Sequence, residues 1–536
     1  MKIFTLCKPY LLSRKFSLLA YILIILLSTA ISILSPYIIG DFLDNLIEGA
    51  DIGVILRFCL IFGGLSVLRI AKGYITAIMH VKLQINMAYD FNRDVLQHVQ
   101  SLSLSYINHQ DSAALSQKIG TDANSLITFC INLLQSFLVN ITMLIVPFII
   151  LLTMNRLTAM FMVGFIAVYF ALYFAFKKPL YNASLAFREA QAKFFSKLLE
   201  QLKYIRLIKI NSIQQEINQR ADTSFIRQLD TAVASQKINY LYSSLDGIIS
   251  TVAQIALFVV GGIQILYGNF TIGMFTIFTS YFHMMLSSSR YFFGLGAFYQ
   301  NTLVSYDRIK EILNQHPESQ GTMVIGGIEK INLKDVSFSY KGLAGESKVL
   351  NRFNAEFVKG NIYAVTGANG AGKSTLISLI QGLYIDEYEG CITYNGTDIR
   401  HINMMAARKN LIGFAEQEPS LIGDSIRYNL SYSGTKLNDY AEILNMQDFI
   451  AKHTLEFEIN ETNSNISGGE KQKVSILKVL CKNPPVMIFD EPTSALDAQT
   501  TEKFINYLQQ IKGDKIIIII THEDVVNGFY DNITRI

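Results

Sequence analysis

The sequence predicts a bundle of membrane-spanning α-helices followed by an α/β domain with a phosphate-binding loop. Three observations support this fold class. Half of the 536 residues are hydrophobic and only 17% are charged, and the hydrophobic residues are concentrated before about Gln315, which is unusual for a soluble protein. From Ile328 onward, short apolar strands alternate with helical patterns. One of these strands, at residues 362–366, ends in a glycine-rich turn that opens a helix.

The turn at residues 367–374 reads GANGAGKS and fits the pattern G-x-x-x-x-G-K-S/T without a gap. Glycines in such a turn let backbone N–H groups approach phosphate oxygens that a Cβ would block. The following helix points its positive end at the same anion. We expect Lys373 to reach the β- and γ-phosphates of ATP and Ser374 to ligate Mg²⁺. The loop residues predicted to contact the nucleotide are Gly367, Asn369, Gly370, Gly372, Lys373, Ser374 and Thr375.

Charge and cysteine content argue against other classes of function. The formal net charge is only +3, too small to indicate nucleic-acid binding, so no nucleic-acid partner is expected. The five cysteines are odd in number and scattered, without the spacing of a metal site. We expect them to be reduced thiols without a role in the chemistry.

The N-terminal segment predicts a retained membrane helix. Residues 1–16 are basic, and an apolar run then continues from residue 17 to about residue 40, longer than the ~20 residues that a span needs. A signal peptide would have a shorter apolar core and a small-residue cleavage site. The start of the chain is therefore expected on the cytoplasmic side.

Five further apolar segments are long enough to cross a lipid bilayer, at about residues 52–79, 124–153, 157–176, 247–267 and 272–294. Residues 41–51 hold four acidic residues and no Lys or Arg, whereas residues 177–237 hold eleven Lys and Arg against five Asp and Glu. Basic connections remain in the cytoplasm. Six spans with both ends of the membrane domain inside satisfy this rule.

The two long connections, residues 80–122 and 177–245, are helical in pattern and are predicted to extend into the cytoplasm. Near their tips lie polar breaks at residues 105–116 and 211–216. These breaks are candidates for docking onto a cytoplasmic domain, and solvated turns are the alternative interpretation.

Polar residues within membrane spans are costly unless they have a partner or face a water-filled cavity. The cases here are Asn132, Gln135, Asn140, Gln254, His283 and Arg290. They either line a substrate cavity or form hydrogen bonds between helices. Arg290, next to three serines, is the strongest candidate for the cavity.

A polar linker separates the hydrophobic first part of the chain from the second part, in which short strands alternate with helices. It contains Pro317 and paired glycines. We therefore predict a six-helix transmembrane domain with long intracellular extensions at residues 1–315, a linker at 316–327 and a nucleotide-binding domain at 328–536.

A buried strand at residues 486–489 leads into two carboxylates, Asp490 and Glu491. Asp490 is placed to hold Mg²⁺, and Glu491 to orient and deprotonate the attacking water as general base. A second apolar strand, residues 516–520, leads to His522. Ligands bind at the carboxyl ends of strands in such sheets, so we expect His522 to contact the γ-phosphate.

The segment 467–472 reads SGGEKQ. Together with the phosphate loop, it resembles the signature motif of the ABC ATPases. The resemblance implies further roles: Tyr340 stacks on adenine, Gln417 touches the metal site and the membrane domain, and residues 494–497 face a partner site. With six spans ahead of the ATPase, the whole chain resembles a half-size ABC exporter, and segments 105–116 and 211–216 match the coupling helices of that family.

The resemblance implies a dimer in which the signature of one subunit meets the ATP of the other. Ser467, Gly469 and Glu470 are then nucleotide contacts, and Gln417 joins Ser374 and Asp490 at Mg²⁺. Because no catalytic group is missing, a homodimer is favoured. Glu470, Ile466 and Lys473 replace the commoner glutamine, leucine and arginine, and we expect hydrolysis to survive. The sequence stops at Ile536, roughly where relatives carry additional strands and a helix.

The implied function is an ATP-driven exporter in a bacterial cytoplasmic membrane, with ATP and Mg²⁺ as cofactors. An amphipathic substrate, such as a ribosomally made antimicrobial peptide, suits a mixed polar and aromatic cavity. The alternatives are a multidrug or lipid exporter (a flippase) and, of another class, an ATP-dependent membrane sensor or immunity protein. A soluble ABC ATPase acting in translation or DNA repair is disfavoured by the six spans.

Overall fold

The computed structural model describes the chain except residues 1, 50, 111–114, 117, 343–344, 431–436, 448, 451–453, 461–464, 495 and 522–528. The chain forms two compact units. The first comprises Met1–Gln97 and Ser112–Asn314, and the second comprises His98–Asp111 and Gln315–Ile536. The second unit therefore includes a short segment that the sequence limits had placed in the membrane domain.

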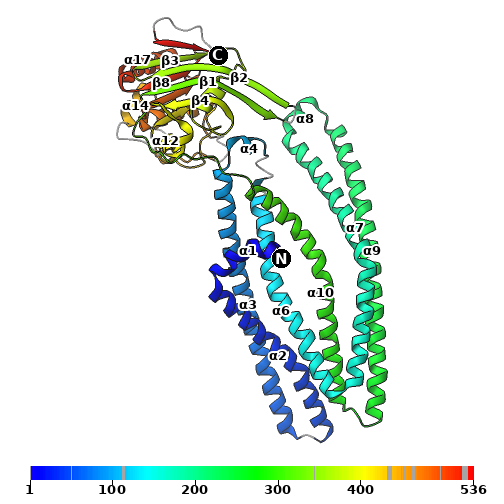
Figure 1. Ribbon diagram of the computed structural model, residues 1–536. Coiled ribbons are helices and arrows are strands. Elements are labelled where there is room, and N and C mark those ends of the chain that lie inside the picture. The colour runs from blue at the N-terminus through cyan, green and yellow to red at the C-terminus, as the bar shows by residue number, and fades with distance from the viewer. Residues whose placement is uncertain are drawn as a thin grey trace. The chain divides into compact units, whose positions relative to one another are not determined.

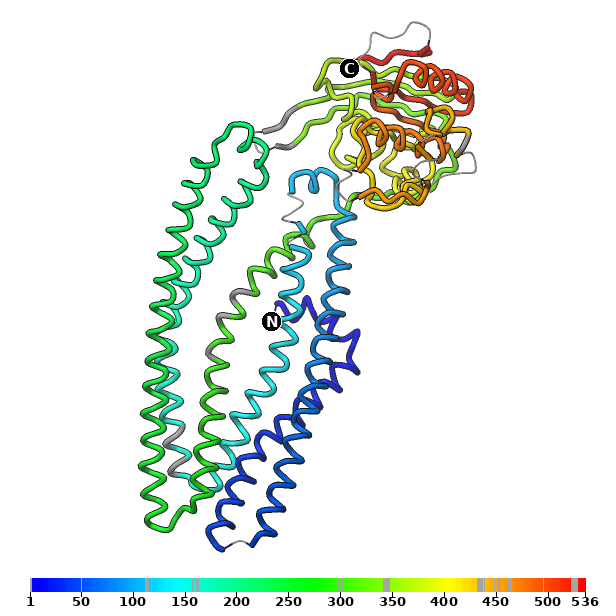
Figure 2. Tube along the Cα trace, turned by 180° about the vertical axis from the view of Figure 1, so that it is seen from behind, coloured from blue at the N-terminus to red at the C-terminus, as the bar shows by residue number. Residues whose placement is uncertain are grey.

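The first unit is helical. Its helices are α1 (Lys2–Ser13), α2 (Lys15–Ile47), α3 (Ile52–Ser101, which runs to the start of the second unit), the π-helix η1 (Lys118–Asp122), α6 (Ala123–Met154), α7 (Arg156–Lys203), α8 (Ile205–Asn211), α9 (Gln214–Leu266) and α10 (Ile272–Leu313). Figures 1 and 2 show α7 and α9 side by side along their length, joined at one end by α8. Two buried clusters hold this unit together, one among α1, α2, α3, α6 and α10 and one among α2, α6, α7, α9 and α10.

Five helices among the described residues are long and apolar enough to cross a membrane, and they contain the first five predicted spans. The predicted sixth span, residues 272–294, lies within the continuous helix α10 but is not among these five. His283, Ser287–Ser289 and Arg290 interrupt its apolar run. The helical membrane fold is confirmed, and the count of six spans stays a prediction.

The ends of α2 and α10 approach closely at a pair of glycines. A Cβ on Gly40 would lie 2.7 Å from the carbonyl oxygen of Gly273, too close for any other side chain. One turn further along α2, Asp44 accepts hydrogen bonds from the Thr271 hydroxyl at 2.6 Å and from the Gly273 N–H at 2.7 Å. The carboxylate thus lies at the positive N-terminus of α10.

The second unit contains two sheets. One is antiparallel with strand order β2-β1-β4-β5, formed by β1 (Lys330–Gly342), β2 (Gly345–Val358), β4 (Tyr388–Tyr394) and β5 (Thr397–Asp398). The other is parallel with order β6-β7-β8-β3-β9, formed by β3 (Asn361–Thr366), β6 (Ile412–Ala415), β7 (Val486–Asp490), β8 (Ile516–Ile520) and β9 (Asn532–Arg535). All five isoleucines of β8 are buried, as expected where helices cover both faces of a parallel sheet.

The helices of this unit are α4 (Leu104–Asn108), α11 (Lys373–Ile380), α12 (Met404–Asn410), α13 (Ile426–Asn429), α14 (Leu437–Ile443), α16 (Gly468–Lys482) and α17 (Ala498–Ile511), with the 3-10 turns η2 (Ile399–His401) and η3 (Lys512–Asp514). Two clusters of buried hydrophobic side chains pack against the sheets. One includes residues of β1, β4 and α11, and the other includes residues of α16 and α17.

The first predicted docking segment is represented by α4. Leu104 packs against the core of the second unit, and the Asn108 amide donates to the Tyr384 hydroxyl at 3.4 Å. The backbone N–H of Glu318 donates to the Ser101 carbonyl at 2.8 Å. The docking prediction is therefore confirmed for residues 105–110, which belong to the second unit; residues 111–114 lie outside the described residues.

The second predicted docking segment, residues 211–216, follows α8. Ser212 takes a left-handed conformation with φ 55°, which ends α8 and lets α9 start at Gln214. On α8 the apolar residues Leu207 and Ile210 are 55% and 71% exposed. This tip therefore carries an apolar surface that the rest of the first unit leaves uncovered.

Candidate functional site

The phosphate loop follows β3, which lies between β8 and β9 in the parallel sheet. Gly370 and Gly372 have positive φ angles of 79° and 105°, a conformation that other residues rarely adopt. A Cβ on Gly372 would also meet the Val349 side chain at 2.7 Å. The predicted glycine pattern is thus required by the loop backbone as well as by the approach of phosphate.

Lys373 opens α11 and folds its side chain back over the loop. Its Nζ donates to the carbonyl oxygens of Gly367 at 2.9 Å and Ala368 at 3.1 Å, and the residue is only 7% exposed. The neighbouring Ser374 is exposed, so its hydroxyl is accessible to a ligand. The ammonium group already lies in the loop where phosphate oxygens are expected.

Tyr340 lies on β1 next to the first turn of α11. Its hydroxyl is hydrogen-bonded to Thr375 Oγ1 at 3.0 Å, and its ring makes edge contacts with Phe338 and Tyr384, with ring centroids 4.9 and 5.9 Å away. The ring is therefore held in place beside the loop, as an adenine platform requires.

Tyr340→Ala is expected to raise the Michaelis constant for ATP by roughly tenfold, because one aromatic stacking contact contributes about 1–3 kcal/mol. Turnover should fall less, since the reacting phosphates lie at the other end of the nucleotide. The measurement is steady-state ATPase kinetics, with Tyr340→Phe as the matched control that keeps the ring. A variant that loses turnover at unchanged Michaelis constant would contradict the platform assignment.

The proposed general base is placed at the end of β7. The Gln417 amide Nε2 donates to Glu491 Oε2 at 2.6 Å, so two residues singled out separately in the sequence are in direct contact. Asp490 is the last residue of β7, and Glu491 follows it with a left-handed φ of 47°. The Glu491 N–H donates to the carbonyl oxygen of Ile520 at 3.0 Å, which connects β7 to the end of β8.

His522 lies outside the described residues. Thr521, directly before it, is buried and follows the end of β8. In the parallel sheet the carboxyl ends of β3, β7 and β8 lie together, because these strands are neighbours and run in one direction. The phosphate loop and the Asp490–Glu491 pair therefore share one edge of the sheet.

The signature segment caps α16. The Ser467 side chain accepts from the Glu470 N–H at 3.3 Å, and the Glu470 carboxylate accepts from the Ser467 N–H at 2.8 Å and from the Ser467 hydroxyl at 2.6 Å. Together they form a capping box. Ser467 and Gly468 are exposed, so the positive end of α16 is open to an anion. The glutamate at position 470 thus stabilises the helix start.

Asp497, the last residue of the segment expected to face a partner, caps α17. Its carboxylate accepts from the Thr500 N–H at 2.9 Å, and this bond holds the pKa of Asp497 below its ordinary value. Ala495 lies outside the described residues. The start of α17 is therefore fixed by a charged cap.

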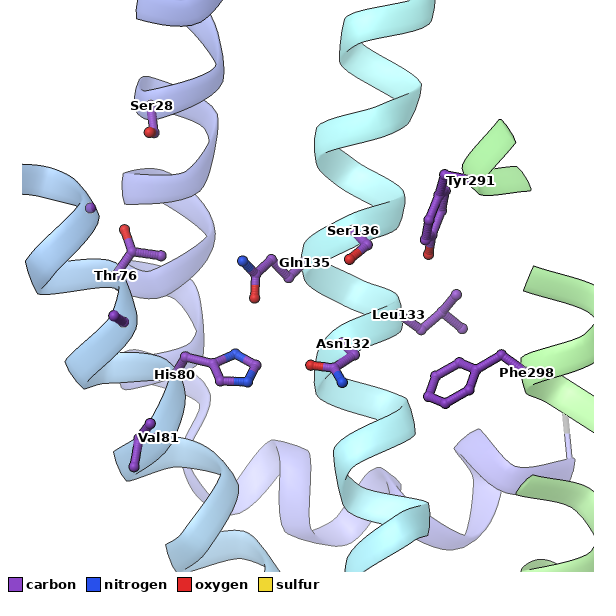
Figure 3. Close-up of a pocket in the computed structure, with 12 residues that line it drawn as sticks. Ser28, Thr76, His80, Val81, Asn132, Leu133, Gln135, Ser136, Tyr291 and Phe298 are labelled. Carbon is purple, nitrogen blue, oxygen red and sulfur yellow. The ribbon is translucent and has the colours of Figure 1, made fainter. Parts of the chain in front are cut away.

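The first unit contains an open cavity of about 780 Å³ with both polar and apolar lining residues (Figure 3). Its lining comes from α2, α3, α6 and α10: Ser28, Gly73, Thr76, Ala77, His80, Val81, Asn132, Leu133, Gln135, Ser136, Tyr291 and Phe298. Asn132 and Gln135, two of the polar residues noted in the sequence, are among them. Asn140 instead donates to the Ser136 carbonyl of its own helix at 2.7 Å.

Tyr21 of α2 connects two walls of this cavity. Its hydroxyl donates to Gln135 Oε1 of α6 and lies 2.8 Å from His80 Nδ1 of α3. Because the single hydroxyl proton is used on Gln135, we assign the proton of that second bond to His80 Nδ1. In the neutral ring Nε2 then remains an acceptor. Sequence reasoning missed Tyr21 and His80, since neither is unusual on its own helix.

Arg290 of α10 is bound within the first unit. Its guanidinium pairs with Asp246 of α9 at 3.0 Å and donates to the Tyr169 hydroxyl of α7 at 3.1 Å. The Tyr169 hydroxyl in turn donates to the Asp246 carbonyl oxygen at 2.8 Å. Arg290 therefore joins three helices and is not among the residues that line this cavity, which favours the second interpretation from sequence, hydrogen bonding between helices.

Asp246→Asn and Arg290→Gln are each expected to lower the thermal unfolding temperature in detergent, by an amount that corresponds to about 1–2 kcal/mol for a partly exposed ion pair. Both substitutions should lower the unfolding temperature by a similar amount, because each removes the ion pair between Arg290 and Asp246. Lys197→Gln, which breaks a surface pair on α7, serves as the control. Arg290 would instead be a substrate ligand if only its own replacement reduced transport.

Comparison with known proteins covers both units. Residues 18–289 match the family model described as "ABC transporter transmembrane region", and residues 350–494 match the model described as "ABC transporter".

Two relatives are similar over most of the chain. One is the Lactococcin-G-processing and transport ATP-binding protein LagD of Lactococcus lactis, 26% identical over 92% of this chain and 71% of its own length. Another is the ATP-dependent lipid A-core flippase of Desulfotalea psychrophila, 26% identical over 96% of this chain and 90% of its own. The fold resembles that of a bacterial Atm1-family ABC exporter with ATP bound, with a TM-score of 0.82 at 20% identity over 97% of this chain and 93% of that one.

Proposed function

The chain belongs to the ABC transporter family as a half-size exporter, an ATP hydrolase coupled to transport, and from this we propose that it moves an amphipathic peptide outward by alternating access. A ribosomally made antimicrobial peptide is the substrate type we favour, and a bacterial cytoplasmic membrane is the location. The matched membrane region makes the chain an integral membrane protein.

The lining of this cavity supports a peptide as the substrate. None of its twelve described lining residues is Lys, Arg, Asp or Glu. Hydroxyl and amide groups of Thr76, Asn132 and Gln135 match the donors and acceptors of peptide bonds, while Tyr291 and Phe298 offer aromatic surface. The Lactococcin-G-processing and transport ATP-binding protein LagD is among the relatives.

The proposed ATP site uses the groups on the shared sheet edge. Lys373 exchanges its two carbonyl partners for phosphate oxygens, and Tyr340 stacks on adenine. Glu491 receives the Gln417 amide on Oε2, and its carboxylate is the proposed acceptor of the proton from the attacking water. Ser374, Asp490 and the Gln417 carbonyl oxygen are all oxygen ligands, the type that Mg²⁺ prefers. When bound, Mg²⁺ neutralises charge on the β- and γ-phosphates.

Half-size ABC exporters typically form dimers, and we propose a homodimer. The open N-terminus of α16 at Ser467, Gly469 and Glu470 then contacts ATP held by the phosphate loop of a second copy. ATP favours the closed dimer only by binding it better than the open one. The apolar tip formed by Leu207 and Ile210 of α8 is the proposed contact through which the first unit receives that movement.

The test is uptake into inverted membrane vesicles that contain the full-length protein. We expect ATP-dependent accumulation of a fluorescent amphipathic peptide, lost in Glu491→Gln and strongly reduced in Gln135→Leu, which removes an amide from the cavity wall. Asn140→Leu is the control, because its amide bonds its own helix. Accumulation of a lipid analogue or a hydrophobic dye in place of the peptide would mean that the substrate is a lipid or a drug-like molecule. Binding of the peptide without accumulation would point to a sensor.

A further inference from the structure

The side chain of Gln472 connects the first turn of α16 to the backbone of Glu491. Gln472 is 3% exposed. Its Nε2 donates to the carbonyl oxygen of Glu491 at 2.9 Å and to Ser494 Oγ at 3.2 Å. The Ser494 hydroxyl donates to the same Glu491 carbonyl at 2.9 Å. One buried donor, Gln472, and one exposed donor, Ser494, therefore converge on one backbone oxygen of the proposed general base.

Neighbouring groups must hold the backbone of Glu491 in its observed conformation. Its φ of 47° is left-handed, and a residue with a Cβ adopts that conformation only where the surroundings enforce it. The N–H side is held by the carbonyl oxygen of Ile520, and the carbonyl side is held by Gln472 and Ser494. If the carbonyl were released, the backbone could relax and carry the carboxylate away from Gln417.

We propose that Gln472 is a positioning residue for ATP hydrolysis: it fixes the backbone of Glu491 so that the carboxylate meets Gln417 and faces the γ-phosphate. The inference rests on the assignment of Glu491 as general base.

The position of Gln472 on α16 adds a second consequence. Its helix begins at the exposed signature, with Ser467 as the cap. In the proposed homodimer that end contacts the ATP of the other copy, whereas Glu491 serves the ATP of its own copy. The buried Gln472 amide thus connects the signature segment, which contacts the ATP of the other copy, to Glu491, which acts on the ATP of its own copy.

Gln472→Leu keeps a similar side-chain volume but removes the amide, and with it the hydrogen bonds to the Glu491 carbonyl oxygen and to Ser494. In the full-length protein reconstituted in liposomes, we expect the turnover number for ATP to fall roughly tenfold, the effect of losing one well-placed hydrogen bond. The Michaelis constant for ATP should change less than about twofold, since Gln472 is not a predicted nucleotide contact. Ser475→Ala is the control: Ser475 is also buried on α16, and its replacement should leave both constants near wild type.

Gln472→Glu separates positioning from simple packing. A protonated carboxyl can donate to the Glu491 carbonyl, whereas a carboxylate can only repel it. The turnover of this variant relative to wild type should therefore be highest near pH 6 and fall as the pH rises toward 9. A packing defect would give a ratio that does not depend on pH in this direction.

The outcomes are distinct for the two assignments. Wild-type turnover in Gln472→Leu, or a parallel loss of turnover, ATP affinity and thermal stability, would overturn the positioning role. Wild-type turnover in Glu491→Gln would overturn the base assignment itself. Loss in Glu491→Gln with full activity in Gln472→Leu refutes only the inference about Gln472.

Discussion

Glu491→Gln is expected to lower the turnover number for ATP by at least about 10²-fold while ATP binding is retained. General-base catalysis by a positioned carboxylate contributes roughly 10²–10⁴-fold, and an amide of the same shape cannot take a proton. Glu491 also contacts Gln417, but Glu491 is not predicted to bind the nucleotide itself. Bound ATP should therefore persist in this variant.

The measurement is steady-state ATPase activity together with filter binding of radiolabelled ATP. Glu502→Gln, an exposed glutamate on α17, serves as the matched control and should behave as wild type. Retained turnover in Glu491→Gln would mean that another residue is the general base. Loss of ATP binding together with turnover would mean that Glu491 is needed for the fold of the site.

Lys373→Ala is expected to weaken ATP binding by about 10²-fold. The ammonium group stands to make at least two charge-assisted hydrogen bonds to phosphate oxygens, each contributing roughly 1.5–3 kcal/mol. The same change removes the partner of the Gly367 and Ala368 carbonyls, so the empty loop should also lose some order. Both effects act on binding, in contrast to Glu491→Gln.

Binding of a fluorescent ATP analogue to the purified protein checks this expectation. The control is Lys359→Ala, which removes a lysine whose ammonium pairs with Asp514 at 3.1 Å on the surface of the same unit. Unchanged affinity in Lys373→Ala would contradict the role of the loop lysine.

The nucleotide site was largely predictable from sequence because its groups lie in short, continuous segments. The backbone angles of Gly370 and Gly372 and the start of α11 at Lys373 follow from a pattern confined to eight residues. The contact between Gln417 and Glu491 joins two motifs whose strands, β6 and β7, are neighbours in the sheet. The individual nucleotide and metal contacts stay predictions.

The membrane unit was predictable in outline only. Hydropathy locates apolar segments, but the helix rotations and neighbours that bring Tyr21 to His80 and Gln135 depend on packing between α2, α3 and α6. The same reason explains Arg290, whose partner Asp246 lies on α9 directly after the connection predicted at residues 177–245. Gln472 was recognised only as the end of the signature segment; its contact with Glu491 was missed because it depends on how α16 packs against the end of β7.

At the predicted outer face, the backbones of α2 and α10 are in close contact at Gly40 and Gly273, with no side chain between them. If the proposed outward export opens the protein at this face, it must separate this contact and remove both hydrogen-bond donors from Asp44. The proposed source of that work is ATP. Substitutions that weaken the contact are therefore expected to raise the leakage of small solutes through the reconstituted protein.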